Sequence, residues 1–403
     1  MKNFPVSIGE TVKATFLERP NRFLVRCIAE GLGVIDAFLP NPGRLWELLL
    51  PRASLYLSPA GPSGSIHPSK RKTNYTVLAV ERKGCPIFLH THLTNQVARY
   101  LIERKLFPPL EGAEIVKKEV LHGRSRFDFL LRENGRDLYL EVKSCTLFGN
   151  GVAMFPDAVT ERGKRHLLAL AEVGRRGIGS AMLFIVHYPH VRWFMPDFHT
   201  DYDFSMNLLR VRNDLMIIPV AIAWKPDLSI GQEVKILEIP WDYLKQEIGD
   251  RGSYLLLLEL QEERLVEIGQ LGRVMFQKGY YIYVGSAMSN LRARIRRHGQ
   301  KRKKEHWHID YLTRGADGFL SLPIRSSQRQ ECEIAQALSS IMKGGPPGFG
   351  SSDCRCLTHL FWSEKNPLHT ESFHDVLQRF RMKHPNYPTD RDMRSVARIS
   401  SPW

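Results

Sequence analysis

The stretch 126–143 (RFDFLLRENGRDLYLEVK) constrains the fold most, because it specifies both a β-hairpin and the register of its strands. Asn134 and Gly135 are a strong hairpin signal, since both positions of a two-residue turn require positive φ. Counting outward from this turn, we predict that Asp128 lies directly opposite Glu141 on one face of the sheet. A β-bulge between the turn and the acids would break this register.

This pair of acids needs a physical explanation, because like charges directly opposite each other destabilise paired strands. Lys143 follows Glu141 by two positions and therefore lies on the same face. Carboxylate oxygens suit Mg²⁺ or Mn²⁺, and a bound metal activates water and stabilises charge that builds on a phosphate. We therefore predict metal ligands at Asp128 and Glu141, with Lys143 as a catalytic residue. The alternative is a solvated hairpin face on which Lys143 only neutralises Glu141.

The composition sets the broad class of the protein. A chain of 403 residues with 43% hydrophobic content exceeds one average domain, so two or three are expected. The net charge of +15 favours an anionic partner, most often nucleic acid, although an ordinary basic protein is the alternative. The sequence shows no apolar run of membrane-span length and no signal peptide, and its six cysteines are mostly scattered. We expect a cytoplasmic protein with reduced thiols.

The pattern along the chain divides it into four parts. Residues 1–86 are short strands separated by turns, which predicts a small barrel of the oligonucleotide-binding (OB) type. Strands alternate with helices in 87–241 and again in 252–362, which predicts two α/β domains. Residues 363–403 are basic and polar, and we expect a partly disordered tail there. The expected strands are 22–30, 32–39, 53–58, 76–82, 180–188, 252–260 and 279–287, and the expected helices are 95–105, 157–176 and a short one after the turn 41–44.

Several motifs in the first half occur together in one family. The segments PNPGRL, RKTNYTVLAVE, THLTNQV, SRFDFLL, LYLEVKSCTL and FPDAVTERGKRHL resemble the sugar fermentation stimulation protein A family over roughly 4–240. The D…E-V-K hairpin also resembles the PD-(D/E)xK nuclease core, with Phe127 in place of the proline. This resemblance implies an OB-type barrel, a nuclease-like second domain and DNA binding, with Asp128 and Glu141 as metal ligands and Lys143 as the catalytic lysine. Glu119 is a further candidate acid, but a surface charge is the favoured interpretation.

Basic residues of the first half indicate where nucleic acid binds. We assign Arg44 of the PNPGRL turn to this role. The predicted helix 157–176 presents Arg162, Lys164, Arg165 and His166 near its start, where positive charge opposes the helix dipole. That placement indicates an external anion such as phosphate; an ordinary amphipathic surface helix is the alternative.

A second basic run, LRARIRRHGQKRKK, lies in the third part and contains eight Arg and Lys residues but no acid. Leu291, Ile295 and His298 repeat at helical spacing, so one face of a helix should pack against the domain. Because an uncompensated run repels itself, we expect it to contact phosphates rather than to be a solvated helix without a ligand. The residues assigned to these contacts are Arg292, Arg296, Arg297 and Lys303.

The third part resembles the GIY-YIG nuclease core, and more narrowly a small GIY-YIG-like domain. Tyr254 matches the first half-motif, with Ser253 in place of isoleucine, and Tyr283 begins the second half-motif. Arg294 matches the catalytic arginine, and the spacing in RQECEIAQAL favours Glu331 over its neighbour Glu333 as the metal ligand. The resemblance implies phosphodiester hydrolysis with Tyr254, Tyr283 and Arg294 as catalytic residues, although the late asparagine of active enzymes has no clear counterpart.

Cys354, Cys356 and His359 invite a zinc interpretation, with His306 or His308 as a fourth ligand. One residue between the cysteines is tighter than the usual spacing, so we favour a glycine-shaped loop over zinc. Three functions stay open: a Mg²⁺- or Mn²⁺-dependent DNA nuclease with two nuclease-type modules, which leads; a non-catalytic nucleic-acid-binding or regulatory protein; and an RNA-directed nuclease.

Overall fold

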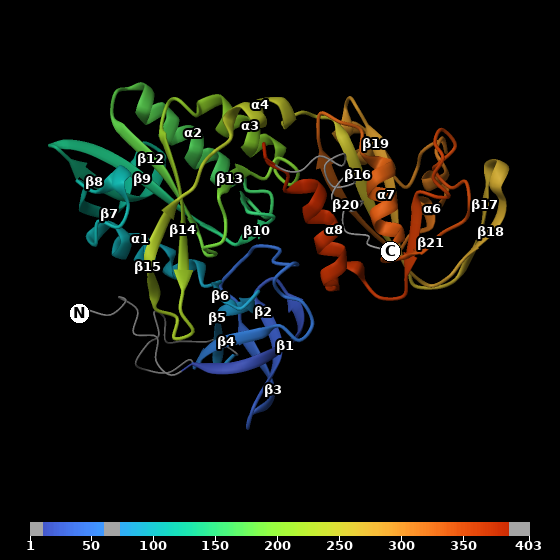
Figure 1. Cartoon of the computed structure of the whole chain (residues 1–403), viewed down its shortest axis with the longest axis horizontal. Coiled ribbons are helices and arrows are strands. Elements are labelled where there is room, and N and C mark those ends of the chain that lie inside the picture. Colours follow the sequence, from blue (N-terminus) through green and yellow to red (C-terminus); the bar gives the residue numbers. More distant parts are fainter. Residues whose placement is uncertain (1–10, 60–72, 387–403) are drawn as a thin grey trace, which may run out of the picture.

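The computed structural model describes residues 11–59 and 73–386, which fold into three successive units (Figure 1). The N-terminal barrel is blue, the central unit runs from cyan to yellow, and the C-terminal unit is orange and red. Within these described ranges, no helix is both long enough and apolar enough to cross a membrane.

The first unit is a closed barrel. Five strands run in the order β3-β2-β1-β4-β5, and a short parallel pairing of Ala37 with Tyr75 closes β3 onto β5. Alternate residues of β2, such as Val25 and Cys27, are buried because they point into the barrel. The OB-like barrel is thereby confirmed, and so are all four strands predicted in it. The strands are β1 (Val12–Asn21), β2 (Leu24–Ala29), β3 (Gly33–Phe38), β4 (Ser54–Pro59) and β5 (Tyr75–Arg82), and β6 (Cys85–Phe88) extends the sheet.

The short helix predicted after the turn 41–44 is wrong. Leu45 has a φ of 54°, a left-handed conformation that interrupts a right-handed helix, and the chain continues in turns. Leu45, Leu48 and Leu49 are instead buried together with the barrel core. Their helix-like spacing therefore reflects packing of an irregular segment.

The second unit is built on a six-stranded sheet in the order β15-β14-β12-β9-β8-β7. Its central strand, β12 (Gly179–Val186), is buried on both faces, which explains its continuous apolar sequence. Leu183 shares a core with α1 (Thr94–Glu103), whereas Phe184 shares a core with α2 (Glu161–Arg175). This confirms the predicted α/β organisation. The other elements are β7 (Glu114–His122), β8 (Ser125–Glu133), β9 (Arg136–Cys145), β10 (Leu147–Gly149), β11 (Val152–Phe155), β13 (Trp193–Pro196), α3 (Tyr202–Val211), β14 (Met216–Trp224), β15 (Ile230–Ile236) and α4 (Trp241–Glu247).

The helix predicted at 157–176 begins only at Glu161. Thr160 is its N-cap, and the Thr160 side chain accepts the backbone N–H of Gly163 at 3.0 Å. Asp157 lies outside the helix and accepts backbone N–H groups of Arg44 and Leu45 from the barrel. The acid that seemed to start the helix therefore connects the first two units.

The third unit contains a five-stranded antiparallel sheet in the order β20-β16-β19-β22-β21. The two central strands, β16 (Gly252–Leu260) and β19 (Gly279–Ala287), pair along their whole length and have the predicted bounds. Tyr254 lies opposite Gly285, where a Cβ would come within 2.5 Å of the tyrosine ring, so glycine leaves room for that ring. The other elements are β17 (Arg264–Ile268), β18 (Gly272–Phe276), α5 (Leu291–His298), α6 (His308–Gly315), β20 (Gly318–Arg325), α7 (Glu331–Ser339), β21 (Lys343–Gly344) and β22 (Leu360–Ser363).

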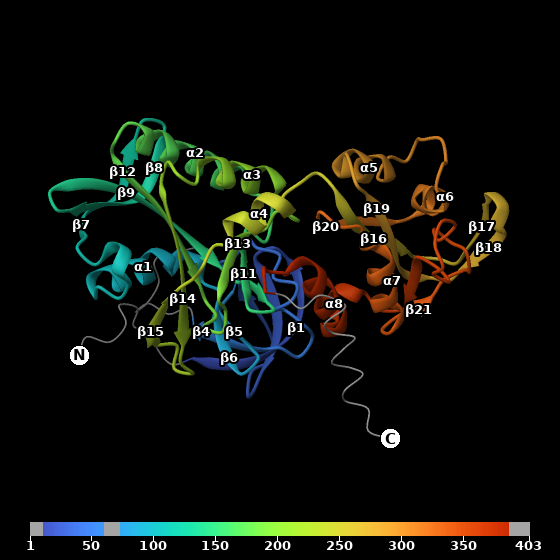
Figure 2. The same ribbon diagram turned by 45° about the horizontal axis from the view of Figure 1, so that its top comes forward.

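The prediction of a disordered tail is wrong for its first part. Residues Glu371–Arg381 form helix α8, whose Phe373, Leu377 and Phe380 are buried in the core of the third unit. These residues recur at helical spacing, a signal that the basic composition obscured. Figure 2 shows α8 beside β1, and Glu371 forms an ion pair with Arg82 of the barrel at 2.7 Å. The rest of the predicted tail, 387–403, lies outside the described residues.

Candidate functional site

The predicted hairpin positions the candidate acids. Its turn residues Asn134 and Gly135 have φ of 50° and 77°, and the predicted register holds from the turn as far as the pair Phe129–Leu140. The ladder ends there, because the Asp128 carboxylate takes the backbone N–H of Val142 at 2.8 Å. The predicted register is therefore confirmed from the turn to Phe129, the residue that follows Asp128, and the regular ladder does not extend to Asp128 and Glu141 themselves.

Asp128 remains beside Glu141 in a buried environment. Its other carboxylate oxygen accepts a hydrogen bond from Asn95 Nδ2, near the start of α1, at 2.8 Å. Burial raises the pKa of Asp128 to about 6, and the negative charge of Glu141 adds to the rise. At neutral pH such an acid is mostly ionised, and its charge is destabilised by burial and by Glu141, so a bound cation would stabilise it.

Glu141 is buried more completely, with 3% of the residue exposed, and it has two close partners. Lys143 Nζ and His166 Nδ1 each lie 2.5 Å from Glu141 Oε1. Burial alone would raise the pKa of Glu141, but the hydrogen bond from His166 and the charge of Lys143 outweigh it and lower the pKa. Glu141 Oε2 is buried and has no hydrogen-bond partner among the described residues. An oxygen in that state is suited to a metal ligand.

The structure therefore joins parts of both interpretations of the hairpin. Lys143 does neutralise Glu141, as the alternative predicted. The face is not solvated, however, because α2 covers it and brings His166 onto Glu141. Glu119, the further candidate acid, is more than half exposed and pairs with Arg126 at 3.4 Å, so it is a surface charge.

Two residues of this site were missed by the sequence-based predictions. Asn95 lies in the motif THLTNQV and His166 in FPDAVTERGKRHL, so both stood in motifs that had been singled out. Asn95 had no assigned role and His166 was grouped with the phosphate-binding residues of its helix, because the position of each helix against the sheet is not encoded in local spacing. The available signal was an isolated polar residue on the otherwise apolar side of a helix, as at His166 beside Leu167 and Leu170.

The basic residues of α2 lie next to this site. Arg162 precedes His166 by one helical turn, and Arg165 is its direct neighbour. Both are exposed and form no ion pair with any residue that the structure describes. Lys164 is instead held by Glu161 at 2.8 Å. Two of the three predicted phosphate contacts are thus free to meet a ligand.

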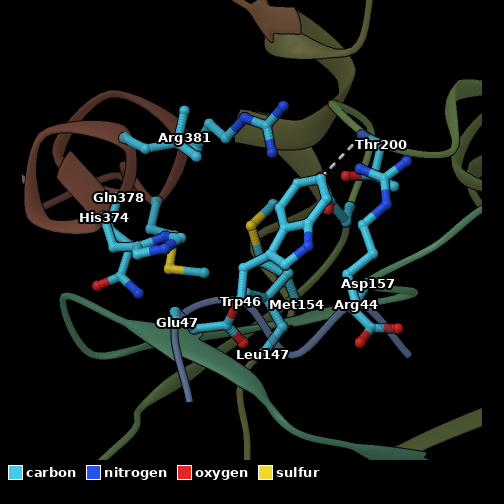
Figure 3. A pocket seen from close by; sticks show the side chains of 13 residues that line it. Arg44, Trp46, Glu47, Leu147, Met154, Asp157, Thr200, His374, Gln378 and Arg381 are labelled. Atoms are coloured by element: carbon cyan, nitrogen blue, oxygen red, sulfur yellow. Dashed lines mark hydrogen bonds between the residues drawn. The ribbon is translucent and has the colours of Figure 1, made fainter. Parts of the chain in front are cut away.

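Arg44 is placed apart from the acids, in a small pocket where the three units meet (Figure 3). Its guanidinium lies 4.9 Å from the centre of the Trp46 ring, and Asp157 lines the same pocket. Burial raises the pKa of Glu47 on the opposite wall to about 7. Arg44 is therefore half-buried among acids and α8 rather than presented on an open face.

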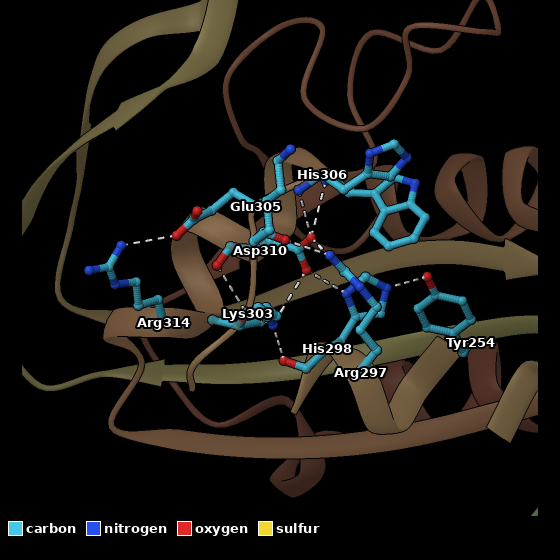
Figure 4. A network of polar contacts seen from close by, with 11 residues as sticks. Tyr254, Arg297, His298, Lys303, Glu305, His306, Asp310 and Arg314 are labelled. Atoms are coloured by element: carbon cyan, nitrogen blue, oxygen red, sulfur yellow. Dashed lines mark hydrogen bonds and ion pairs between the residues drawn. The ribbon is translucent and has the colours of Figure 1, made fainter. Parts of the chain in front are cut away.

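In the third unit, the tyrosine of the first half-motif heads a buried polar chain (Figure 4). The Tyr254 hydroxyl lies 2.9 Å from His298 Nε2, and His298 Nδ1 lies 2.9 Å from Asp310 Oδ1. Hydrogen bonds from His298 and Arg297 overcome the effect of burial and hold the pKa of Asp310 well below its usual range. Asp310 thus stays ionised and orients His298 to accept the Tyr254 hydroxyl proton. Sequence reasoning had assigned His298 to packing and had not considered Asp310.

The other predicted residues of this unit gather around Tyr254. Arg294 lies within hydrogen-bonding reach of the Tyr254 hydroxyl, and its guanidinium lies 4.2 Å from the centre of the Trp307 ring. Tyr283 lies on the neighbouring strand, with its ring centre 6.4 Å from that of Tyr254. Burial raises the pKa of both tyrosines. Glu331 is buried, and Arg329 binds its Oε1.

The basic run 291–304 is more compensated than its sequence indicates. Arg292 bonds to Asp203 of α3 at 3.0 Å, and Arg297 bonds to Asp310 at 2.8 Å. Lys303 is buried and pairs with Asp310 at 3.4 Å. The prediction of an uncompensated run is therefore wrong for these three residues, because carboxylates from distant segments neutralise them. Arg296 alone among the four predicted contacts is exposed without an ion pair to the part of the chain that the structure describes.

A cluster of sulfur and nitrogen ligands forms beside this site. Cys354, Cys356 and His359, for which the sequence favoured a glycine-shaped loop over a zinc site, come together, and their fourth neighbour is Cys332 of α7. The prediction of His306 or His308 in this position is wrong. The His306 ring makes an edge-to-face contact with Trp307, and His308 Nδ1 accepts the N–H of Gly350 at 3.1 Å.

Comparisons with known proteins divide the chain in a similar way. Residues 17–89 match the SfsA N-terminal OB domain, 92–227 match the sugar fermentation stimulation protein RE domain, and 253–382 match a domain of unknown function, DUF123. A sugar fermentation stimulation protein homolog from Moorella thermoacetica is 42% identical over 198 residues, which are 49% of this chain and 83% of the relative. A homolog from Methanosphaera stadtmanae is 38% identical over 194 residues, 48% of this chain and 79% of the relative.

A solved structure is also similar to part of this chain. It is that of Pyrococcus furiosus SfsA in complex with Ca²⁺, which is 26% identical and superposes with a TM-score of 0.52. The match covers 59% of this chain and 99% of that protein.

Proposed function

The chain belongs to the sugar fermentation stimulation protein family, and we propose that it binds DNA and hydrolyses phosphodiester bonds with a Mg²⁺ or Mn²⁺ held by Asp128 and Glu141. The observation that carries this proposal is a pair of neighbouring acids, in which half-buried Asp128 has a raised pKa and buried Glu141 has one oxygen without a hydrogen-bond partner among the described residues. A divalent cation would relieve both features, because it offsets the repulsion between the Asp128 and Glu141 carboxylates and satisfies Glu141 Oε2. The Pyrococcus furiosus relative is in complex with Ca²⁺, a cation that also prefers oxygen ligands.

The residues around the acids have distinct roles in this proposal. A bound metal supplies an activated water and offsets the charge that develops on the phosphate. Asn95 orients Asp128, and His166 orients Glu141, so the two acids keep their geometry when their charges change. Lys143 is close enough to Glu141 to take up or deliver a proton at the attacking water. This second unit would then be a PD-(D/E)xK-like nuclease domain.

Nucleic-acid binding is supported by features of all three units. The first unit is an OB-like barrel, a fold that often binds oligonucleotides. Arg162 and Arg165 supply uncompensated positive charge one turn or less from His166. Arg296 supplies a similar charge on the third unit, and the whole chain carries a net charge of +15. DNA is the proposed substrate, and RNA is a competing outcome of the test below.

The third unit supports a second candidate function. We infer a GIY-YIG-like domain with Tyr254, Tyr283 and Arg294 at its site and Glu331 as its metal ligand. Two observations favour a non-catalytic, DNA-binding role for this unit. Burial raises the pKa of Tyr254 and Tyr283, and the Glu331 carboxylate already forms an ion pair with Arg329. In that case the second unit carries the hydrolysis and the third contributes affinity or regulation.

The test compares cleavage of plasmid, single-stranded DNA and RNA in Mg²⁺ or Mn²⁺ and in EDTA. We expect cleavage of DNA by the wild type and a loss of at least about 100-fold in Asp128→Asn and Lys143→Ala. Asp137→Asn is the matched control, because it changes a half-buried acid on the same hairpin whose carboxylate pairs with Arg132 at 2.8 Å. Arg294→Ala separates the two units, since it should leave cleavage unchanged if the second unit alone is active.

The same experiment can overturn the proposal. If the wild type leaves every substrate intact but binds DNA in a salt-sensitive way, the non-catalytic function holds. If only RNA is cleaved and Asp128→Asn abolishes that cleavage, the proposed metal-dependent hydrolysis at Asp128 is supported and the proposed DNA substrate is wrong.

A further inference from the structure

We propose that Cys332, Cys354, Cys356 and His359 bind one structural Zn²⁺ ion in the third unit. One ligand atom from each residue, a sulfur or an imidazole nitrogen, lies within 4.8 Å of all the others. Three cysteines and one histidine are a usual ligand set of structural zinc sites. The proposal goes beyond the hydrolysis proposed above, because it concerns a different metal, a different unit and a different role.

The dimensions of the cluster fit a tetrahedral ion. With Zn–S of about 2.3 Å and Zn–N of about 2.0 Å, tetrahedral geometry separates sulfur from nitrogen by roughly 3.6 Å and two sulfurs by roughly 3.8 Å. Cys354 Sγ lies 3.5 Å from His359 Nε2. The remaining distances, all below 4.8 Å, need only small side-chain movements to reach these values.

The ligands come from three places that the fold holds together. Cys332 lies in the first turn of α7, which packs against β22, and His359 directly precedes β22. The backbone of His359 is fixed on both sides, since its N–H donates to Phe349 O at 2.8 Å and its carbonyl accepts from Val284 N–H at 2.9 Å. Cys354 and Cys356 lie in the irregular loop between β21 and β22. The rigid parts thus supply two ligands, and the loop supplies the other two.

Phe349 anchors the first part of the loop in the core of the third unit, but the segment after it, which carries the two cysteines, has no apolar residue in that core. Gly348 donates its N–H to Leu357 O at 2.8 Å and closes the loop across its base, while Leu357 itself is 71% exposed. A loop of this length without regular structure usually needs an additional constraint. A metal ion bound by Cys354 and Cys356 would supply that constraint.

The ligand chemistry selects zinc and a structural role. Soft thiolates bind Zn²⁺ in preference to Mg²⁺, so this site would not compete for the cation proposed at Asp128 and Glu141. Four protein ligands leave no open position for water or substrate, which distinguishes a structural from a catalytic zinc. Disulfides are a poor alternative explanation, because three thiols cannot all be paired within the cluster.

The proposed zinc site lies next to the candidate site around Tyr254, so the ion would also affect the position of Glu331 there. Cys332 directly follows Glu331, whose charge acts on the Tyr254 hydroxyl. Zinc at Cys332 would fix the start of α7 against the loop and so hold Glu331 at the candidate site of the third unit. Cys332 is thus a positioning residue for Glu331.

The test measures metal content in the full chain purified under reducing conditions. We expect about one zinc per chain, and cobalt exchanged into the site should give the strong visible bands of a tetrahedral thiolate complex. Cys356→Ser and Cys332→Ser should lower zinc affinity at least roughly tenfold. Cys85→Ser is the matched control, because Cys85 is a half-buried free thiol in the barrel, and it should keep the full metal content.

Further variants keep the proposal falsifiable if a serine variant fails to fold. His359→Cys should retain zinc, because four cysteines also form a structural zinc site, whereas His308→Ala should have no effect on metal content. The proposal is overturned if the folded, reduced wild type contains no zinc and takes up neither zinc nor cobalt on titration. It is also overturned if Cys85→Ser loses the metal or if His359→Ala keeps it.

Discussion

At the scale of single residues, the local environment shifts the pKa values of Asp128 and Glu141 in opposite directions. Burial and the charge of Glu141 raise the pKa of Asp128 to about 6. The hydrogen bond from His166 and the charge of Lys143 lower the pKa of Glu141. Carboxylates whose pKa values are pushed apart can take different roles in one reaction. In the metal-free protein, Asp128 carries the exchangeable proton and Glu141 the permanent charge.

This difference predicts a pH-dependent stability that depends on Asp128. Because its folded pKa lies above its unfolded value of about 3.8, the folded state binds the extra proton and stability falls as the pH rises from about 4 to about 6. Above pH 6, metal-free Asp128→Asn should therefore unfold at a higher temperature than the wild type, by roughly 2–6 °C. The difference should vanish near pH 4, as differential scanning fluorimetry in EDTA can determine.

Excess Mg²⁺ supplies the control for this prediction. It should stabilise the wild type and leave Asp128→Asn unchanged, which reverses or removes the difference. If the wild type and Asp128→Asn unfold at equal temperatures at all pH values in EDTA, the pKa of Asp128 is not raised in the folded protein.

His166 is predicted to act through Glu141 rather than on the substrate. Without its hydrogen bond, the pKa of Glu141 should rise, because burial then dominates. His166→Ala should reduce cleavage by about 10- to 100-fold and move the acidic limb of the pH–rate profile to higher pH. His166→Gln, which can still donate a hydrogen bond, should restore part of the rate. A loss of rate without any shift of the profile would argue for a merely structural role.

The sequence was sufficient for the part of this site that depends on one hairpin. The Asn134–Gly135 turn determined the register, and the register brought Glu141 and Lys143 to the face where Asp128 also lies. The regular ladder stops before Asp128 because the Asp128 carboxylate, and not a backbone carbonyl, accepts the N–H of Val142. No strand pattern in the sequence reveals such a replacement.

At the scale of secondary-structure elements, α2 combines two functions on opposite faces. Its buried face carries His166 into the site, and its exposed face carries Arg162 and Arg165. Its start was mispredicted, because Asp157 is bound to the barrel and Thr160 is the true N-cap. α8 was missed for the opposite reason, since its basic residues concealed an apolar face that packs on the third unit. Strand bounds were more accurate because β16 and β19 are nearly continuous apolar runs.

The exposed face of α2 predicts a salt-dependent contribution to DNA binding. Removal of one basic side chain that binds a phosphate should reduce the slope of log K against log salt by about 0.9 for duplex DNA. The double variant Arg162→Ala, Arg165→Ala should therefore bind more weakly at low salt and show a slope smaller by roughly 1.8. Fluorescence anisotropy over a salt series measures both quantities.

Arg175 offers a matched control on the same helix. It lies at the far end of α2 and is paired with Asp214 at 2.9 Å, so Arg175→Ala should change the slope little. If the double variant and Arg175→Ala behave alike, α2 does not face the nucleic acid.

At the scale of the whole molecule, charge is used to join the units as well as to attract a ligand. Arg325 of β20 is buried, and its guanidinium donates to the carbonyls of Phe198 and His199 in the second unit at 2.8 and 2.5 Å. The Arg325 backbone N–H also donates to His199 Nδ1 at 2.9 Å. Arg292, which looked like a phosphate contact, bridges to Asp203 nearby. The net positive charge of the sequence therefore overstates the charge available to DNA.

Arg325 is therefore one of the residues that join the second and third units, together with contacts of α8 such as the hydrogen bond between His199 Nε2 and Arg381 O at 2.8 Å. Arg325→Leu would leave two buried carbonyls without donors, at a cost of about 1–3 kcal/mol for each. Arg292→Ala, by contrast, removes an exposed ion pair worth about 1 kcal/mol or less. We expect Arg325→Leu, but not Arg292→Ala, to enlarge the radius of gyration in small-angle X-ray scattering and to speed proteolysis between α4 and β16. Because zinc binding and the hairpin site each lie within one unit, Arg325→Leu should leave zinc content and Mg²⁺-dependent stabilisation intact. Loss of either would mean that the units fold as one body rather than as modules joined by Arg325.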